Sequence, residues 1–240
     1  MEIFPVLEAI FNKIYGSSPY KSPTDMGVNM AGYAIIDDEA CAEASRREIL
    51  RRYYQALSDR LDGRAQDSVV YKLELLKNTA NITDDERPVI AAARAKSEAT
   101  GGAPAFAIEL PDGAVVTGKT SSLLGASSAA LLNALKHLAG IDDSVDLISP
   151  DKIEPIQHLK VSHMGNKNPR LHTDELLITL AICGVTDENA ARTIECLNDL
   201  SGCEAHSSVI LSRVDESVFR KLGVNLTSEP RYETERAYRK

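Results

Sequence analysis

The chain has 240 residues, of which 43% are hydrophobic and 26% charged, and a formal net charge of −8 at pH 7. A chain of this length buries a sizeable core and holds one or two domains, and its composition is that of an ordinary globular protein. The negative charge argues against a nucleic-acid-binding surface, which needs a basic face, and no apolar run approaches the roughly 18 residues that span a bilayer.

The N-terminus and the cysteines indicate a reduced, cytoplasmic protein. Residues 1–16 contain Glu2 and Glu8, and they have neither a basic stretch nor a small-residue cleavage site, so they do not form a signal peptide. The four cysteines stand at positions 41, 183, 196 and 203 without a C-x-x-C pair, which is typical of free thiols.

The first 99 residues are predicted to form a helical domain. Apolar spacing indicates helices over 3–15, 38–61 and 66–78, and a capping box at Thr83 opens another that continues to Ala99. The segment 20–38 has no clean period and is predicted to be an ordered loop, whose candidate binding groups are Lys21, Asp25 and Asn29. Turn chemistry is the alternative explanation of these polar residues.

Four arginines, Arg46, Arg47, Arg51 and Arg52, lie close together on the predicted 38–61 helix. They would suit a phosphate clamp. Because Glu43 and Glu48 lie among them, a solvated face held by ion pairs is the favoured interpretation.

Residues 100–104 are the predicted domain boundary, because strands and helices alternate after them. A β-hairpin is predicted over 105–110 and 114–119. The later predicted elements are a helix ending at Leu138, a strand over 146–148, a helix over 150–163 bent at Pro155, a polar loop over 164–172, helices over 173–183 and 188–202, a strand over 203–212, a helix over 215–222 and an edge strand over 224–226. This order predicts an α+β or α/β chain in which residues 100–240 form a three-layer α/β/α domain with a mixed sheet.

A candidate anion site lies at the predicted junction between the 114–119 strand and the next helix. A helix start leaves about four backbone N–H groups without partners and carries roughly half a positive charge. An anion such as phosphate would suit that position, and Lys119 would add a full charge. The alternative is a serine N-cap beside a turn-forming glycine, because only half of a P-loop motif is present. The candidate residues are Gly118, Lys119, Thr120, Ser121 and Ser122.

A candidate acid–base pair lies at the start of the 203–212 strand. Strand alternation places Glu204 and His206 on the same face, so the two would pair while a nucleophile came from elsewhere. The alternative is a buried histidine that is hydrogen-bonded for structural reasons.

A third polar group forms the predicted rim of the site. His163 and His172 are nine residues apart, and Lys167 and Arg170 lie between them. No H-E-x-x-H or P-C-x-x-C motif occurs, and no third ligand stands at a recognised spacing, so no metal site is expected.

Several long strings of the sequence resemble one bacterial family. They include YKSPTDMGVN (20–29), VTGKTSSLLGASSA (116–129), HLKVSHMGNKNPRLHTDE (158–175) and GCEAHSSVILS (202–212). All resemble the C-terminal half of the family called domain of unknown function 1846, also known as uncharacterised protein family 0371. The resemblance covers nearly the whole chain and is specific, because long strings match.

The resemblance implies proteins about twice as long, in which a Rossmann-like part with a G-P-G-S-G-K loop suggestive of nucleotide binding precedes this region. No such loop occurs in this sequence, so we expect a fragment, a domain or one half of a split gene. The resemblance also implies a helical bundle followed by a domain of cytidine-deaminase-like topology. The deaminase zinc signature is absent, and topology alone does not imply deamination.

Together these inferences predict part of an active site for a phosphate- or nucleotide-linked substrate, completed by the missing Rossmann-like half. ATP or another nucleotide would serve the full-length members, and this chain alone would be inactive. The alternative is a non-catalytic interaction module that forms a homo-oligomer through its helical domain. An exposed apolar stripe on the 3–15 helix would favour that alternative.

Overall fold

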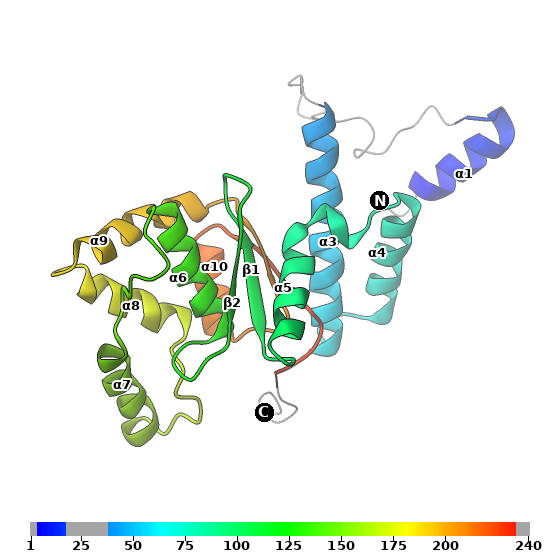
Figure 1. Ribbon diagram of the computed structural model, residues 1–240. Helices are drawn as coiled ribbons and strands as arrows, with labels where there is room; N and C mark the ends of the chain where they lie inside the picture. Colours follow the sequence, from blue (N-terminus) through cyan, green and yellow to red (C-terminus); the bar gives the residue numbers. More distant parts are fainter. Residues whose placement is uncertain (1–3, 18–37, 234–240) are drawn as a thin grey trace. The chain divides into compact units, whose positions relative to one another are not determined.

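A computed structural model describes residues 4–17 and 38–233 of the chain. The chain divides into two compact units, Met1–Glu86 and Arg87–Lys240, which are described separately (Figure 1). The predicted binding groups Lys21, Asp25 and Asn29 lie outside the described residues. Within the described ranges, no helix is both long and apolar enough to cross a membrane.

The first unit is helical, and its helices lie where apolar spacing predicts them. α3 (Asp38–Leu61) packs on α4 (Asp67–Thr79), and α1 (Phe4–Tyr15) precedes both. The buried residues of α3 include Leu50 and Tyr54. These side chains are one turn apart on the same face, so they give the helix its buried stripe.

The clustered arginines of α3 form ion pairs, as the favoured interpretation predicts. Arg46 pairs with Glu86, Arg47 with Glu43, and both Arg51 and Arg52 with Glu48. Arg46 also donates a hydrogen bond from Nη1 to the Ala80 carbonyl over 3.1 Å. The cluster therefore serves the packing of this unit.

The second unit is organised around a four-stranded sheet with the order β2-β1-β3-β4. β1 (Ala105–Glu109) and β2 (Val115–Lys119) form the predicted antiparallel hairpin. β3 (Glu204–Ser207) pairs antiparallel with β1, and β4 (Asn225–Ser228) pairs parallel with β3. The predicted mixed sheet is confirmed, whereas the three-layer, cytidine-deaminase-like topology stays a prediction.

One face of the sheet carries the main hydrophobic core. β1 contributes Phe106 to this face, where it packs with α6 (Ala126–Leu138) and α10 (Arg213–Lys221). The Phe106 ring stacks on Phe219 of α10 with 4.8 Å between the ring centroids. Strand alternation therefore assigns the even-numbered residues of β1 to this core.

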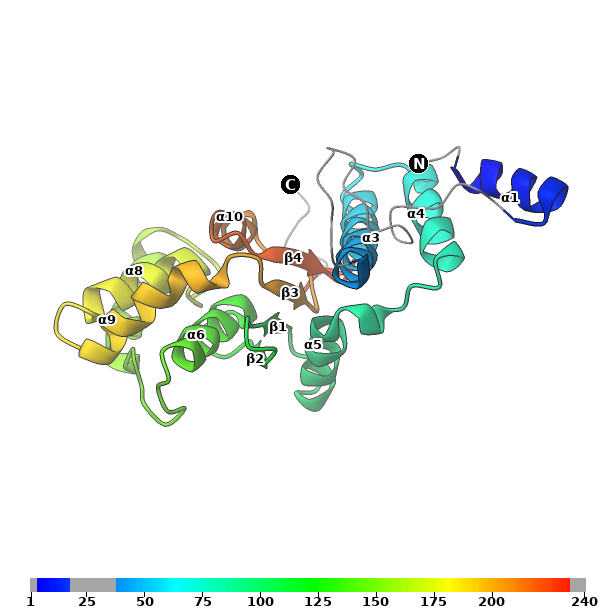
Figure 2. The same cartoon turned by 90° about the horizontal axis from the view of Figure 1, so that it is seen from above.

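The opposite face of the sheet is covered by α5 (Pro88–Ala99) (Figure 2). Ala107 of β1 is buried there against Val89 and Ala93 of α5. The sequence interpretation placed α5 in the helical domain before residue 100. In the structure α5 belongs to the second unit, because its apolar face has the sheet as its partner.

The helix α5 also begins later than its predicted capping box. Residues 84–86 form a 3-10 turn, η1, and the Thr83 hydroxyl donates to Asp85 Oδ2 over 3.2 Å. The first residue of α5 is Pro88. Proline suits this position because its missing N–H would have no intrahelical acceptor there.

The remaining elements follow the predicted order. They are α7 (Pro150–His158), which continues into the π-helical turn η2 (Leu159–His163), α8 (Thr173–Cys183), α9 (Glu188–Glu195) and the 3-10 turn η3 (Cys196–Leu200). α7 contains Pro155 as predicted.

Two predicted strands differ from the structure. Residues 146–148, which the structure describes, form no strand; the ammonium of Lys136 binds the neighbouring carbonyls of Asp143 and Val145 over 2.7 and 2.8 Å. The 203–212 strand is confined to β3, because the chain leaves the sheet at Ser208, whose hydroxyl accepts a hydrogen bond from the N–H group of Ala105 over 2.8 Å.

The ends of β2, β3 and β4 lie at one edge of the sheet, together with the start of β1. The register pairs Lys119 with Ala105, and Ser207 with both Phe106 and Ser228. The segments 120–125, 208–212 and 229–233 therefore leave the sheet from the same edge. The first two lead into α6 and α10, so the N-termini of both helices lie near this edge.

Gly118 allows β2 and α6 to approach closely. A Cβ atom at this position would lie 2.2 Å from the backbone nitrogen of Ala130 and 2.7 Å from the carbonyl oxygen of Ala126. Backbone atoms cannot move aside as a flexible side chain can, so only glycine fits.

We expect Gly118→Ala to destabilise the second unit by about 1–3 kcal/mol through overpacking. Urea unfolding measures the effect. Gly125→Ser is the matched control, because a Cβ atom there meets nothing closer than 3.8 Å and serine is a favoured N-cap. Equal unfolding midpoints for the two variants would contradict the packing role of Gly118.

Candidate functional site

The predicted anion site at 118–122 does not coincide with a helix N-terminus. α6 begins only at Ala126, and the loop before it uses its own donors. The N–H group of Thr120 donates to the Pro104 carbonyl over 2.9 Å, and that of Ser121 donates to the Leu124 carbonyl over 3.0 Å. These backbone groups are therefore already hydrogen-bonded within the protein.

The side chains of the 118–122 group also diverge. Gly118 faces α6, so alternation along β2 places the exposed Lys119 on the opposite face of the sheet. Ser122 is exposed, and its carbonyl accepts a hydrogen bond from Gln157 Nε2 over 2.9 Å. Anion binding at these residues stays a prediction. In this geometry their polar groups do not converge on one position where an anion could bind.

Glu204 and His206 lie in a buried polar network beneath α5. Arg87 Nε donates to Glu204 Oε2 over 2.7 Å, and its Nη1 donates to the Thr227 hydroxyl over 2.5 Å. His206 Nδ1 lies 2.8 Å from Thr227 Oγ1, and Nε2 lies 3.3 Å from Glu229 Oε1. The network therefore links β3, β4 and the start of α5.

The protonation of this network follows from burial. Burial lowers the pKa of His206, so its ring is neutral at pH 7. Burial alone would raise the pKa of Glu229, but hydrogen bonds from His206 and Arg94 outweigh it and hold that pKa below its ordinary value. The Glu229 carboxylate must then accept a hydrogen bond from the Nε2–H group, and Nδ1 must accept one from the Thr227 hydroxyl.

Both ring nitrogens of His206 are thus occupied, and its side chain is fully buried. This arrangement matches the structural alternative for His206. The acid–base role predicted for His206 and Glu204 gains no support from it, because a substrate has no ring nitrogen to approach.

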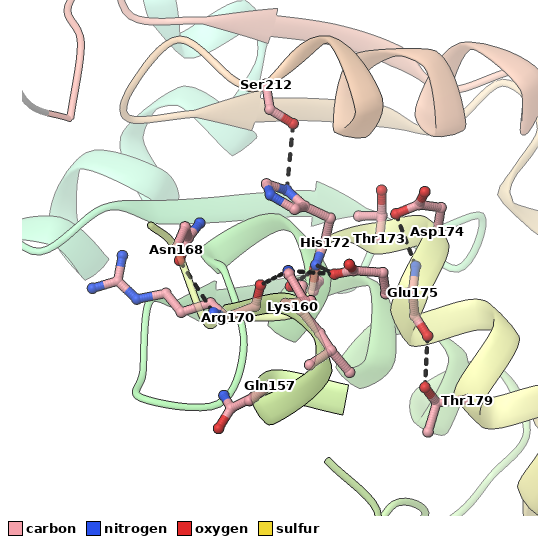
Figure 3. A network of polar contacts seen from close by, with 12 residues as sticks. Gln157, Lys160, Asn168, Arg170, His172, Thr173, Asp174, Glu175, Thr179 and Ser212 are labelled. Carbon is pink, nitrogen blue, oxygen red and sulfur yellow. Dashed lines mark hydrogen bonds and ion pairs between the residues drawn. The ribbon is translucent and has the colours of Figure 1, made fainter. Parts of the chain in front are cut away.

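A different histidine, His172, lies at the strand-end edge of the sheet (Figure 3). It directly precedes α8, and its neighbour Leu171 is held against the loop before α6. The Leu171 N–H donates to the Leu123 carbonyl over 2.9 Å, and the Leu171 carbonyl accepts from Ser128 Oγ over 2.9 Å. The backbone beside His172 is therefore fixed by hydrogen bonds to two neighbouring segments.

The His172 ring is oriented by the carboxylate of Asp215, in the first turn of α10. His172 Nδ1 lies 3.0 Å from Asp215 Oδ2. Thr173 donates to Oδ1 from both its N–H group and its hydroxyl over 2.9 Å, and the Ser212 hydroxyl donates to Oδ2 over 2.7 Å. The carboxylate is buried, and its hydrogen bonds join the N-termini of α8 and α10.

The hydrogen bond with Asp215 raises the pKa of His172, although burial opposes the shift. Burial alone would raise the pKa of Asp215, but hydrogen bonds from His172, Thr173 and Ser212 hold it below its ordinary value. Both pKa shifts favour the ionised form of the pair, an imidazolium beside a carboxylate. The Nδ1 atom of His172 faces Asp215 and Ser212, and 29% of the side chain is exposed.

A second ion pair fixes the backbone on both sides of His172. The buried ammonium of Lys160 donates to the Arg170 carbonyl over 2.5 Å and to Glu175 Oε2 over 2.6 Å. Glu175 Oε2 also accepts from the His172 N–H over 2.9 Å. Figure 3 shows these groups converging below the His172 ring.

The other predicted rim residues lie around this cluster without joining it. Arg170 Nη1 forms an ion pair with Glu233 Oε1 over 2.8 Å. His163 packs its ring edge-on against His158, and Lys167 is exposed in the loop before α8. Among the predicted rim residues that the structure describes, only His172 therefore has the surroundings of a reactive group.

The arrangement suits proton transfer by His172 Nε2. A buried carboxylate that holds Nδ1 and leaves Nε2 open is how a general acid or base is oriented. Ser212 lies on the Nδ1 side, at 3.4 Å, and its proton goes to Asp215, so it is not placed as a nucleophile. Within the described part of the chain, no group of three or more His, Cys, Asp or Glu side chains is arranged to hold a metal ion.

The sequence analysis missed the partners of His172. They are Lys160, Glu175, Ser212 and Asp215. The spacing Ser-x-x-Asp over 212–215 is the signal that marks an N-cap and its first turn, whereas its contact with His172 depends on the tertiary fold.

Comparison with known proteins identifies the family. The family model for the domain of unknown function DUF1846, C-terminal, matches residues 85–238, and the model for DUF1846, N-terminal, matches residues 1–81. The chain belongs to the DUF1846 family. The resemblance noted in the sequence is thereby confirmed.

Curated relatives in this family are bacterial proteins named UPF0371. The relative from Streptococcus thermophilus (strain ATCC BAA-491 / LMD-9) is 53% identical over 240 residues, which are 100% of this chain and 48% of the relative. Relatives from Corynebacterium glutamicum (strain R) and Streptococcus pneumoniae (strain JJA) are 54% and 52% identical with the same coverage. The chain spans about half the length of the curated relatives it matches.

The buried Arg87–Glu204 pair predicts a large loss of stability when one partner is removed. Arg87→Leu should cost about 3–5 kcal/mol, because it leaves the buried Glu204 carboxylate without its guanidinium. Replacing both residues by Leu should cost less than the sum of the two single changes, since no charge then stays buried. Urea unfolding measures both, and Arg52→Leu, in an exposed pair, should cost below about 1 kcal/mol. If the double variant lost as much stability as the sum of the two single variants, Arg87 and Glu204 would not be energetically coupled.

The His172–Asp215 pair predicts a pH window of stability. Because the pKa of His172 is raised in the folded state, its ion pair contributes to the free energy of unfolding. This stabilisation is complete below the unfolded pKa, about 6.5, and is lost as the pH rises through the folded pKa. Because the pKa of Asp215 is lowered in the folded state, its stabilising contribution is complete above the unfolded pKa, about 3.9. It is lost as the pH falls through the folded pKa.

We therefore expect His172→Gln to lower the Tm most between about pH 4 and 6.5, and least at high pH. Thermal melts of both proteins across this range give the comparison, with the exposed His163→Gln as the control. A Tm difference that does not change with pH would show that the pair is not ionised.

Proposed function

We propose that the second unit carries an acid–base site for an anionic, phosphate- or nucleotide-linked substrate, with His172 as its proton-transferring group. The observation that carries the proposal is the His172–Asp215 pair, in which a buried carboxylate holds Nδ1 of a partly exposed imidazole. Groups arranged in this way, with a shifted pKa, are concentrated at functional sites.

The preference for an anion rests on the local charge. The partial positive charge at a helix N-terminus disfavours an imidazolium beside it. The negative charge of Asp215, on the buried side of the ring, offsets this repulsion. An anion that approached Nε2 from solvent would add to this compensation and would also meet the partial positive charge at the start of α8. Anionic groups are therefore the ligands that this position favours.

Each neighbour of His172 has a role in this proposal. His172 Nε2 donates a proton to a substrate oxygen, or accepts one, and Asp215 holds the ring as a positioning residue. Lys160 and Glu175 keep the preceding backbone in place.

The remainder of the active site would come from the other half of the longer family chains. Those relatives carry about as many residues again, and the Rossmann-like part implied by the sequence resemblance would bind ATP or another nucleotide. This chain alone is therefore expected to bind anions but not to complete a reaction.

A non-catalytic interaction module is the second candidate function. It is favoured by the apolar stripe on α1, where Leu7, Ile10 and Ile14 are all exposed. An amphipathic helix with its apolar face open is a common docking element. In that case the helical unit would mediate homo-oligomer formation.

Thermal melting with inorganic phosphate, pyrophosphate and ATP tests the proposed site. A ligand at about 100 times its Kd stabilises the folded state by roughly 2.7 kcal/mol, which raises the Tm by several degrees. We expect this shift in the unmodified chain and in Lys119→Ala, and its loss in His172→Gln.

Two other results of this melting experiment would contradict the proposed site. A shift that is lost in Lys119→Ala and kept in His172→Gln would return the anion site to the 118–122 loop and contradict our proposal. The absence of a shift with any of the three anions would leave the interaction module as the better function.

A further inference from the structure

The helix α8 is apolar on two opposite faces. Its inner face is formed by Leu176, Leu180 and Cys183, which are buried in the main core. Its outer face carries Ile178 and Ile182, which are 61% and 67% exposed. The only charged residues of the helix are Asp174 and Glu175, in its first turn.

The outer face continues beyond the end of the helix. Val185 follows the stripe at the next position, seven residues after Ile178, and is 83% exposed. Ile178 and Ile182 are four residues apart and lie on one side of the helix, and Val185 adds a third exposed apolar side chain in the turn directly after it. Single exposed apolar residues are normal on protein surfaces, whereas a continuous stripe without a charge marks an interaction site.

We infer that the outer face of α8, defined by Ile178, Ile182 and Val185, is the docking surface for the half of the longer family chains that this chain does not span. A helix that is hydrophobic on all sides is normally buried. The relatives are closely similar over the whole of this chain, which forms only 48% of their length. The additional half is therefore a partner of sufficient size to cover this face.

The size of the stripe distinguishes this partner from a second copy of the chain. One stripe of three side chains offers a few hundred Å² of apolar surface, whereas a stable complex between free chains buries about 800 Å² on each partner. Two parts of one chain stay together over smaller surfaces, because the tether gives an effective concentration in the millimolar range. A covalently linked half is therefore the occupant that the area favours.

This inference rests on the proposed function in one respect, because it concerns the half that would complete the active site. His172 is followed directly by α8, so a partner lying along the outer face of this helix would be held beside the imidazole. The docking surface itself is argued from exposure and composition and does not depend on anion binding.

Hydroxyl-radical footprinting tests the inference on two proteins as they exist, this chain and the full-length Streptococcus thermophilus relative. We expect the peptide covering 173–187 to be modified several-fold more slowly in the relative than in this chain. The peptide covering α4, which includes the exposed Tyr71, is the internal reference and should react at the same rate in both.

Two footprinting results would contradict the docking surface. Equal modification of the α8 peptide in both proteins would overturn the docking surface. Protection in this chain that grows with its concentration would assign the face to a second copy and would overturn it equally. The two proposals can fail separately. If one of these results were obtained while His172→Gln still abolished the rise in Tm with phosphate, the docking surface would be wrong and the anion site would be retained.

A charge substitution provides an independent test. Ile182→Lys should leave the Tm of this chain unchanged, because the side chain is already in solvent. The same change at the aligned position of the full-length relative should lower its Tm by several degrees, and Tyr71→Lys should change neither protein. A large loss of stability in this chain alone would show that the outer face is already covered, and would contradict our inference.

Discussion

The buried carboxylate of Asp215 accepts hydrogen bonds from the first residues of α8 and from the residue that caps α10. These two helices come from separate parts of the sequence, so this carboxylate sets how their N-termini meet. It also holds the His172 ring by Nδ1. A buried charge is stable only when it is paired and fully hydrogen-bonded. The same requirement that orders the two helices therefore also orders the imidazole.

The Arg87 network follows the same rule on the other face of the sheet. Its guanidinium binds Glu204, Thr227 and the carbonyls of Ala205 and Asn225. These acceptors belong to the two neighbouring strands β3 and β4, whereas Arg87 directly precedes α5. All the charge in this network is directed inward, which gives it a structural role and leaves the outward-facing chemistry to His172.

Local patterns were sufficient to predict the elements but not their contacts. Apolar spacing located α3 and α8, and alternation located the β1–β2 hairpin, because those periods follow directly from backbone geometry. The short apolar run at 146–148 does not form the expected strand, and Lys136 binds the carbonyls of Asp143 and Val145 beside it. The site was only partly predictable: His172 was identified as a polar rim residue, but Asp215 lies 43 positions later and only the fold brings the two together.

Two of the histidines of the second unit, His206 and His172, differ in how deeply they are buried. His206 and His172 each bind a carboxylate, yet burial lowers the pKa of His206, whereas the hydrogen bond that His172 donates to Asp215 raises the pKa of His172. A neutral ring with both nitrogens occupied can only support the structure. A charged ring with one open nitrogen can exchange a proton with a ligand. The difference arises because His206 lies in the middle of the sheet, while His172 lies at the strand-end edge, where the helices begin and solvent reaches the ring.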